Sequence, residues 1–218
     1  MKFISIFRRS IRGFTMVELM ISIAIMMLMT GLLLFNYPES AIRMTLINSV
    51  QTTALLVREA QVRGSAIDSV NSSLGGYGVY IKIVDANTLS AVTLFGDSVS
   101  NYGVASFYGL PIGNGLYDIT PIDETNSVTS IPKNYKITKV CVGQSPNITC
   151  SETVNTSLTI SFTRPSARPN IYLNGNNTTS YSKACIEFKS PIPYSVGHIR
   201  SVEVYNSGMI RTAIASCI

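Results

Sequence analysis

One carboxylate of this chain lies in an apolar stretch of sequence, where its charge needs a partner. Glu18 is the only charged side chain between Phe14 and Phe35, a run that reads FTMVELMISIAIMMLMTGLLLF. Placing such a group in hydrocarbon costs about 2.5–3.5 kcal/mol, so an ionisable residue there indicates a functional site. As a helix the run would be about 33 Å long, enough to cross a hydrocarbon core of about 30 Å. We therefore expect a transmembrane helix over residues 14–35 that carries one functional carboxylate.

The residues before this run are basic and include no acid. Lys2, Arg8, Arg9 and Arg12 predict a cytoplasmic N-terminus, with everything after residue 35 outside the cytoplasm. The rest of the chain then holds 13 basic and 12 acidic residues, which does not indicate a broad nucleic-acid-binding surface. An ordinary secretory signal has a shorter apolar core and a small-residue cleavage site, which residues 36–41 lack. A twin-arginine signal at Arg8 and Arg9 fits poorly with so hydrophobic a run. A plain membrane anchor would explain the length but not Glu18.

The residues from Arg12 to Leu19, RGFTMVEL, resemble the prepilin cleavage motif of type IV pilins and type II secretion pseudopilins. The resemblance implies that a membrane peptidase cuts between Gly13 and Phe14 and then N-methylates Phe14. Glu18 would become the fifth mature residue and face the new Phe14 amine of a neighbouring subunit. Each charge is costly alone in apolar surroundings, so the pair favours assembly. Glycine suits a scissile position because a protease needs an extended backbone and space there.

The sequence after the apolar run predicts how the helix continues and what it packs against. Pro38 predicts an interruption of the helix, because proline lacks an N–H and clashes with the preceding turn. From Ser40 to Gly64 the helical period resumes. Its apolar stripe, broadened by Leu46 and Leu55, should pack on a sheet, and consists of Ile47, Val50, Ala54 and Val57. The stretch 54–64 also resembles the stem-to-head segment of the GspH/FimT-type pseudopilins.

Beyond Gly64 the sequence changes to short segments rich in β-branched and aromatic residues, separated by polar loops. We expect strands over residues 78–84, 89–95, 135–142, 158–163, 185–189, 199–205 and 209–213, the last two joined by a hairpin turn at Asn206-Ser207-Gly208. The predicted fold is α+β, a pilin fold in which a long N-terminal helix packs on an antiparallel sheet. The predicted parts are a leader (1–13), the helix (14–64, transmembrane over 14–35) and an extracytoplasmic head (65–218).

The four cysteines all fall in the predicted head. An even number in an exported domain indicates disulfides, and four cysteines allow three connectivities. The pilin resemblance favours a bridge between Cys185 and Cys217, like the C-terminal loop bridge of many pilins, and leaves Cys141 and Cys150 to close a short loop. No C-x₂-C pair is present and His198 is the only histidine, so we expect no metal site. No G-x-S-x-G or P-loop motif appears, and we expect neither a cofactor nor an enzymatic activity.

One binding motif is partly present near the C-terminus. Some FimT-like minor pilins bind DNA through G-R-x-R, and the corresponding residues here are Gly208-Met209-Ile210-Arg211. Methionine replaces the first arginine, while Arg200 and Arg211 remain as candidate contacts. Phosphate binding relies on clustered cations, and the head is nearly balanced in charge. DNA binding is therefore the alternative rather than the main interpretation.

Together these features predict a structural subunit, a minor pilin or pseudopilin of a type IV pilus or a type II secretion-like filament. Its partners would be a prepilin peptidase, other pilin or pseudopilin subunits and an inner-membrane assembly platform. It would first lie in the cytoplasmic membrane and then in a cell-surface or periplasmic filament. The alternatives are a DNA- or ligand-binding minor pilin of an uptake machine and a plain membrane-anchored binding head.

Overall fold

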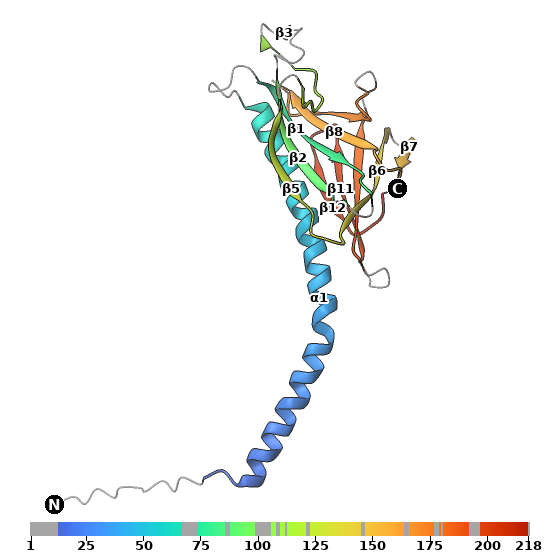
Figure 1. Cartoon of the computed structure of the whole chain (residues 1–218). Coiled ribbons are helices and arrows are strands. Elements are labelled where there is room, and N and C mark those ends of the chain that lie inside the picture. Colours follow the sequence, from blue (N-terminus) through green and yellow to red (C-terminus); the bar gives the residue numbers. More distant parts are fainter. Residues whose placement is uncertain are drawn as a thin grey trace, which may run out of the picture. The chain divides into compact units, whose positions relative to one another are not determined.

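The structure is a computed structural model of the whole chain (Figure 1). It describes residues 13–66, 74–85, 88–98, 106–107, 110–111, 113–120, 123–144, 147–163, 166–176, 179, 181–191 and 197–217. The chain consists of two compact units, Met1–Ala41 and Ile42–Ile218. One long helix, α1 (Met16–Ser65), contributes its first part to the first unit and its second part to the other.

The helix of the first unit runs without interruption. Its helical backbone continues through Pro38, so the predicted break at that proline is wrong. Proline removes one N–H donor and one helical hydrogen bond. The leucines, methionines and isoleucines that precede it are good to fair helix formers, and the helix extends past the single defect.

The helix of the second unit, residues 42–65, buries one stripe of its surface in the head. Leu46, Val50, Val57 and Ala60 are almost completely buried in the main core. These spacings of four, seven and three residues bring the side chains onto one face. Leu55 was expected to broaden the stripe, but it is 68% exposed. It precedes Val57 by two residues, which turns it about 200° away around the helix.

Two antiparallel five-stranded sheets form the rest of the head (Figure 1). The first sheet has the order β5-β2-β1-β8-β9 and the second has the order β12-β11-β10-β6-β7. The strands of the first sheet are β1 (Leu74–Lys82), β2 (Ala91–Ser98), β5 (Thr125–Ser130), β8 (Ser157–Thr163) and β9 (Pro169–Leu173). Those of the second are β6 (Lys136–Gln144), β7 (Asn147–Ser151), β10 (Lys183–Lys189), β11 (Ile199–Tyr205) and β12 (Ile210–Ala213). A small two-stranded sheet joins β3 (Ser106–Phe107) to β4 (Leu110–Pro111).

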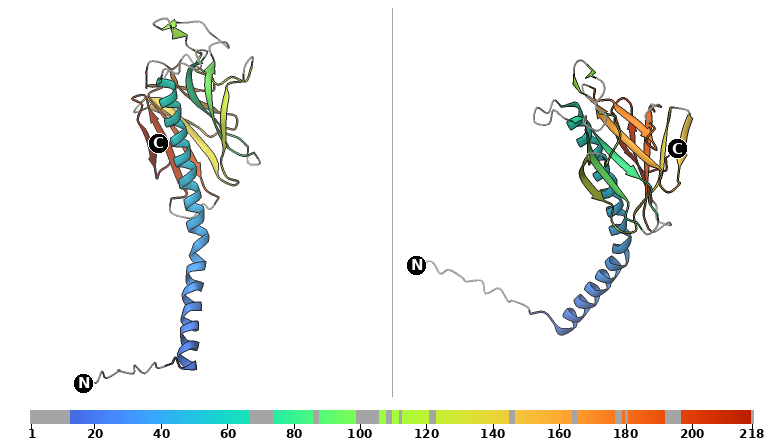
Figure 2. Two further views of the ribbon diagram at one scale, coloured as in Figure 1. Left: turned by 90° about the vertical axis from the view of Figure 1, so that its left-hand side faces the viewer. Right: turned by 45° about the horizontal axis from the view of Figure 1, so that its top comes forward.

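Both sheets and the helix contribute to one apolar core. The first sheet supplies side chains such as Ile81, Ile160 and Phe162, and the second supplies others such as Ile186 and Val202. Successive side chains of a strand point to opposite faces, so each of these strands turns alternate residues inward. Figure 2 shows α1 running alongside the sheets. The architecture is that of an α+β pilin fold, with two sheets where the sequence analysis expected one.

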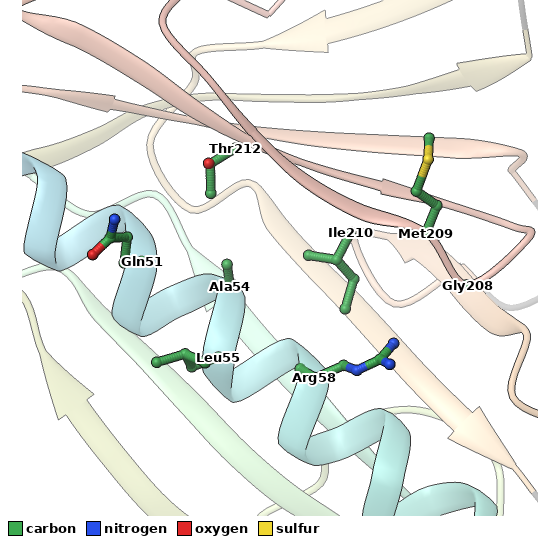
Figure 3. Close-up of a pocket in the computed structure, with 8 residues that line it drawn as sticks. All are labelled: Gln51, Ala54, Leu55, Arg58, Gly208, Met209, Ile210 and Thr212. Carbon is green, nitrogen blue, oxygen red and sulfur yellow. The ribbon is translucent and has the colours of Figure 1, made fainter.

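Within the head, α1 lies beside an edge strand of each sheet. One hollow is lined by Ser49 and Thr53 of α1 and by Thr129 of β5. The other is a groove of about 670 Å³ between α1 and β12 (Figure 3). The residues that line this groove are Gln51, Ala54, Leu55, Arg58, Gly208, Met209, Ile210 and Thr212. The helix therefore fills the side on which the two sheets end in β5 and β12.

A buried glutamine fastens this helix to the turn before β12. The Gln61 side chain is 7% exposed, and its Nε2 donates to the carbonyl oxygens of Ala167 (3.0 Å) and Gly208 (3.1 Å). Its Oε1 accepts a hydrogen bond from Arg58 Nη1 at 2.5 Å. Gly208 has a φ of 84°, and a Cβ there would lie 2.6 Å from Gln61 Nε2. The turn therefore needs glycine both for its backbone conformation and for space.

Replacing Gln61 with leucine should destabilise the head by about 2 kcal/mol, because the buried Gly208 carbonyl oxygen and the partly buried contact to the Ala167 carbonyl oxygen lose their donor. Equilibrium urea unfolding of the full chain in detergent would measure the change. Gln51→Leu is the matched control, since Gln51 lies on the same helix but is exposed. Equal stability of the two variants would show that the Gln61 hydrogen bonds contribute nothing to the fold.

Most of the strands of the head were expected from the sequence. β1, β2, β6, β8, β10, β11 and β12 overlap the predicted segments, and the turn at residues 206–208 joins β11 to β12. The strands β3, β4, β5, β7 and β9 were missed. β5 has the sequence TNSVTS and exposes most of its side chains, as an edge strand can. Such a strand lacks the apolar alternation that predicts strands.

Candidate processing and assembly site

The helix begins inside the predicted cleavage motif, at Met16. Thr15 is the N-cap of α1, because its Oγ1 accepts a hydrogen bond from the Glu18 N–H (3.3 Å) and its carbonyl oxygen accepts one from the Leu19 N–H (3.2 Å). The side-chain contact satisfies one of the backbone donors that a helix start leaves unpaired, and the carbonyl contact is the first hydrogen bond of the helix. Glu18 lies in the first turn, where the helix dipole favours a negative charge. The motif therefore defines the helix start two residues after the predicted scissile bond.

The backbone on either side of that bond is accessible. Gly13 and Phe14 precede the helix, and the Phe14 side chain is 78% exposed. A Cβ built on Gly13 would meet no atom within 4 Å. Nothing in the described part of the chain requires glycine at this position. A requirement for glycine must therefore come from whatever molecule acts on the bond.

The first part of α1 presents an apolar surface that the chain itself does not cover. Met16–Leu34 is long and apolar enough to cross a membrane, and none of this span is buried. The hydroxyls of Ser22 and Thr30 donate to the carbonyl oxygens of Glu18 and Met26, so they are satisfied within the helix. The Glu18 carboxylate is then the one charge that this surface must accommodate.

Both disulfides of the favoured connectivity are present in the head. Cys141–Cys150 links β6 to β7, with a Cα–Cα distance of 4.0 Å. Cys185–Cys217 links β10 to the segment after β12, with a Cα–Cα distance of 5.8 Å. Cys141 is also the direct cross-strand partner of Cys185, so the two bridges lie side by side on the second sheet.

A buried carboxylate supports the second bridge. Glu187 of β10 is 5% exposed, and its Oε1 accepts a hydrogen bond from Thr138 Oγ1 at 2.9 Å. Its Oε2 accepts from the Cys217 N–H at 3.3 Å and from the Ser216 hydroxyl. Glu187 follows Cys185 by two residues, so both point to the same face of the sheet. The segment after β12 is therefore held by a covalent bond and by an adjacent acceptor.

The two candidate DNA contacts are not brought together. Arg211 of β12 donates through Nε to Glu203 Oε2 at 2.8 Å, and Lys183 lies 3.0 Å from Glu203 Oε1. Burial by itself would raise the pKa of Glu203, but hydrogen bonds from Lys183, Tyr205 and Arg211 lower it overall. Arg200 lies three residues before Glu203 on β11 and therefore points to the opposite face. Its Nε is buried and has no hydrogen-bond partner.

No cluster of side chains in the described ranges is arranged to bind a metal ion. Among those residues, no group of three or more His, Cys, Asp and Glu side chains could hold a metal ion. His198 is half-buried, and its backbone carbonyl accepts the Ser190 N–H at 3.0 Å. Besides Arg58, Gln51 and Thr212, the side chains that line the groove of Figure 3 are apolar.

Sequence reasoning missed three buried polar side chains that organise the head, Gln61, Asp97 and Glu187. Each makes hydrogen bonds with residues distant in sequence. Gln61 lies in a predicted helix and Glu187 in a predicted strand, where a polar side chain is usually assigned to the solvated face. For Asp97, the sequence showed only a carboxylate two residues after the end of a predicted strand. Its position did not indicate which distant residues it would contact.

A comparison with known families supports the N-terminal site. Residues 8–34 match the model of the prokaryotic N-terminal methylation motif. No curated protein and no solved structure matches the chain. The matched residues contain Arg8, Arg9 and Arg12, the predicted Gly13–Phe14 cleavage bond, Glu18 and the apolar span Met16–Leu34. This match supports the likeness of the N-terminal segment to type IV prepilins.

Proposed function

We propose that the protein is a structural subunit, a minor pilin or pseudopilin, of a type IV pilus or a type II secretion-like filament. The observation that carries this proposal is the combination of the methylation motif with an apolar helical span, none of which is buried within the described part of the chain. Such a surface needs either lipid or other helices around it. A filament core built from many such helices supplies the second environment once the subunit leaves the bilayer.

The motif implies processing by a prepilin peptidase before assembly. Hydrolysis of the Gly13–Phe14 peptide bond removes the basic leader and gives Phe14 a free α-amine, to which a methyl group is then transferred. The methylated amine remains a cation at neutral pH. The mature chain therefore begins with a positive charge at Phe14 and a negative charge at Glu18, both at the start of an apolar helix.

These two charges give the assembly a defined register. Within one chain, the Thr15 side chain caps the helix and so holds Glu18 in the first turn. A neighbouring subunit that brings its Phe14 amine to this carboxylate neutralises both charges. Any other axial offset leaves each charge alone among apolar side chains, at a cost of about 3–5 kcal/mol. The charge pair thus selects one stagger between adjacent helices.

The disulfides of the head favour a location outside the cytoplasm. All four cysteines form disulfides in the structure, and disulfides persist in oxidising compartments. The basic leader favours the same orientation. A minor rather than a major role, and a relation to the GspH/FimT-type subgroup, are proposed from the likeness of residues 54–64 to that subgroup.

Replacing Glu18 with glutamine should leave cleavage intact but reduce incorporation into filaments at least about 100-fold, because the amine would be unpaired in the filament core. The experiment expresses the chain with a prepilin peptidase and an assembly platform, and compares the filament and membrane fractions by immunoblot. Glu59→Gln is the matched control, since it removes a carboxylate from the same helix that pairs with Arg63 on the surface. Normal assembly of Glu18→Gln, or retention of a processed wild-type chain in the membrane, would favour a plain anchored head.

A further inference from the structure

A segment between β2 and β5 packs on the face of the first sheet that points away from the core. The covering segment, residues 113–120, places the Tyr117 ring 4.8 Å from that of Tyr80 and 5.5 Å from that of Phe95. The Tyr117 hydroxyl also forms a hydrogen bond with Thr125 Oγ1 at 2.6 Å. One aromatic cluster therefore fixes the middle of the segment.

A completely buried carboxyl group lies beneath the start of this segment. Asp97 of β2 is 0% exposed, and its Oδ2 accepts the Gly115 N–H at 2.8 Å. Its Oδ1 has no hydrogen-bond partner. A Cβ on Gly113 would lie 1.9 Å from that Oδ1, so the backbone of the segment directly covers it. Water can reach the Asp97 carboxyl only when the covering segment lifts.

The titratable groups that face Asp97 do not neutralise it. Glu124 accepts the Ser98 N–H (2.8 Å) and the Asp118 N–H (3.0 Å) with its two oxygens. Burial raises the pKa of Asp97 to about 7, and the charges of Glu124 and Asp118 raise it further, while backbone hydrogen bonds from Gly115 and Asn114 offset only part of the increase. Tyr172 of β9 faces the same carboxyl, and burial followed by the Asp97 charge raises its pKa.

We propose that Asp97 is a proton-dependent latch: the protonated carboxyl keeps the covering segment closed on the first sheet, and loss of the proton favours opening. An ionised Asp97 would be a charge in a dry site, with one oxygen unpaired and two carboxylates nearby. Lifting the segment hydrates it and breaks the Gly115 hydrogen bond and the Tyr117 contacts. Unfolding β2 would instead break the ladders to both β1 and β5, so the segment moves first.

The pH dependence has a defined sign and window. In the closed state the pKa of Asp97 is about 7, and in the open state it returns towards the ordinary aspartate value of 3.8. Between these values opening releases a proton, so the opening constant rises about tenfold per pH unit. Over this range the opening constant rises about 1000-fold in total. It is constant below about pH 3.8 and above about pH 7.

Hydrogen exchange of the full mature chain in detergent micelles, between pH 4 and pH 8, tests the latch. After correction for intrinsic rates, amide protection from Gly115 to Asp118 should fall about 1000-fold with rising pH and stay below that of β1 and β8. Asp97→Asn should remove this dependence and keep the segment closed. Asp118→Asn removes one nearby negative charge and should therefore lower the pKa of Asp97 in the closed state. The upper plateau should then be reached at lower pH, and the total change in protection should be smaller. The exposed Asp123→Asn should behave as wild type.

Two results would overturn the proposal. One is the same pH dependence in wild type and Asp97→Asn, which would assign the titration to another group. The other is equal protection of the covering segment and of β1 at every pH, which would mean that the segment opens only when the whole head unfolds.

Discussion

Replacing Gly13 with valine should leave the whole chain uncut, so that it still begins at Met1 after expression with a prepilin peptidase. The isolated chain has room for the larger side chain, since nothing lies within 4 Å of a Cβ at Gly13. The residue is also outside α1, so neither packing nor the helix is affected. Loss of cleavage would therefore report contact with the peptidase, where a β-branched residue narrows the backbone conformations available at the scissile bond. Intact mass and N-terminal sequencing would show the result.

Gly31→Ala is the matched control for this experiment. A Cβ on Gly31 also meets nothing within 4 Å, but this glycine lies well inside α1. Alanine there should favour the helix by about 1 kcal/mol and leave cleavage unchanged. A Gly13→Val chain that is cut and methylated at Phe14 would contradict the assigned site. A wild-type chain that is never cut would remove the basis for placing it in the pilin pathway.

The second large effect concerns the bridge between Cys185 and Cys217. Replacing both residues with alanine should destabilise the head by about 4 kcal/mol in the loop-entropy model, because this bridge closes a loop with a sequence separation of 32. The paired Cys141→Ala, Cys150→Ala variant should lose about 3 kcal/mol, since its separation is only 9. Urea unfolding of both variants in detergent would measure the difference.

The two variants differ in structure as well as in loop length. Without Cys185–Cys217, the segment after β12 keeps only the Glu187 hydrogen bonds made by Ser216 and Cys217, and it should become sensitive to proteolysis. Without Cys141–Cys150, β6 and β7 keep their ladder, and proteolysis near residue 217 should not change. A larger loss of stability for the Cys141 and Cys150 pair would show that loop closure does not control the effect.

The processing site could be predicted from the sequence because its signals are local. Gly13, Phe14 and Glu18 stand within six residues, and the apolar span follows directly. Helix and strand segments with a strong apolar period were found for the same reason. The resemblance to pilins also led to the disulfide pairing, which residue spacing alone left open among three connectivities.

The arrangement of the head depends on contacts between distant residues, which no local pattern reports. Tyr77 of β1 pairs with both Gly96 of β2 and Phe162 of β8, and only the second pairing is distant in sequence. The division into two sheets follows from such pairings. Gln61 and Asp97 acquire their roles from partners that the fold brings to them. The sequence around a polar residue in a periodic segment does not indicate which distant residues it will contact.

The order of strands in the two sheets has a consequence for biosynthesis. A chain is made from its N-terminus, and β1 and β2 are complete long before β8, which must pair with β1 in the middle of the first sheet. The second sheet likewise joins β6 to the later β10. The first sheet therefore cannot be completed before β8 and β9 have been made, and the second cannot be completed before β12 has been made. Until then the apolar sides of β1 and β2 lack their partners, and we expect holding chaperones to bind such a nascent chain.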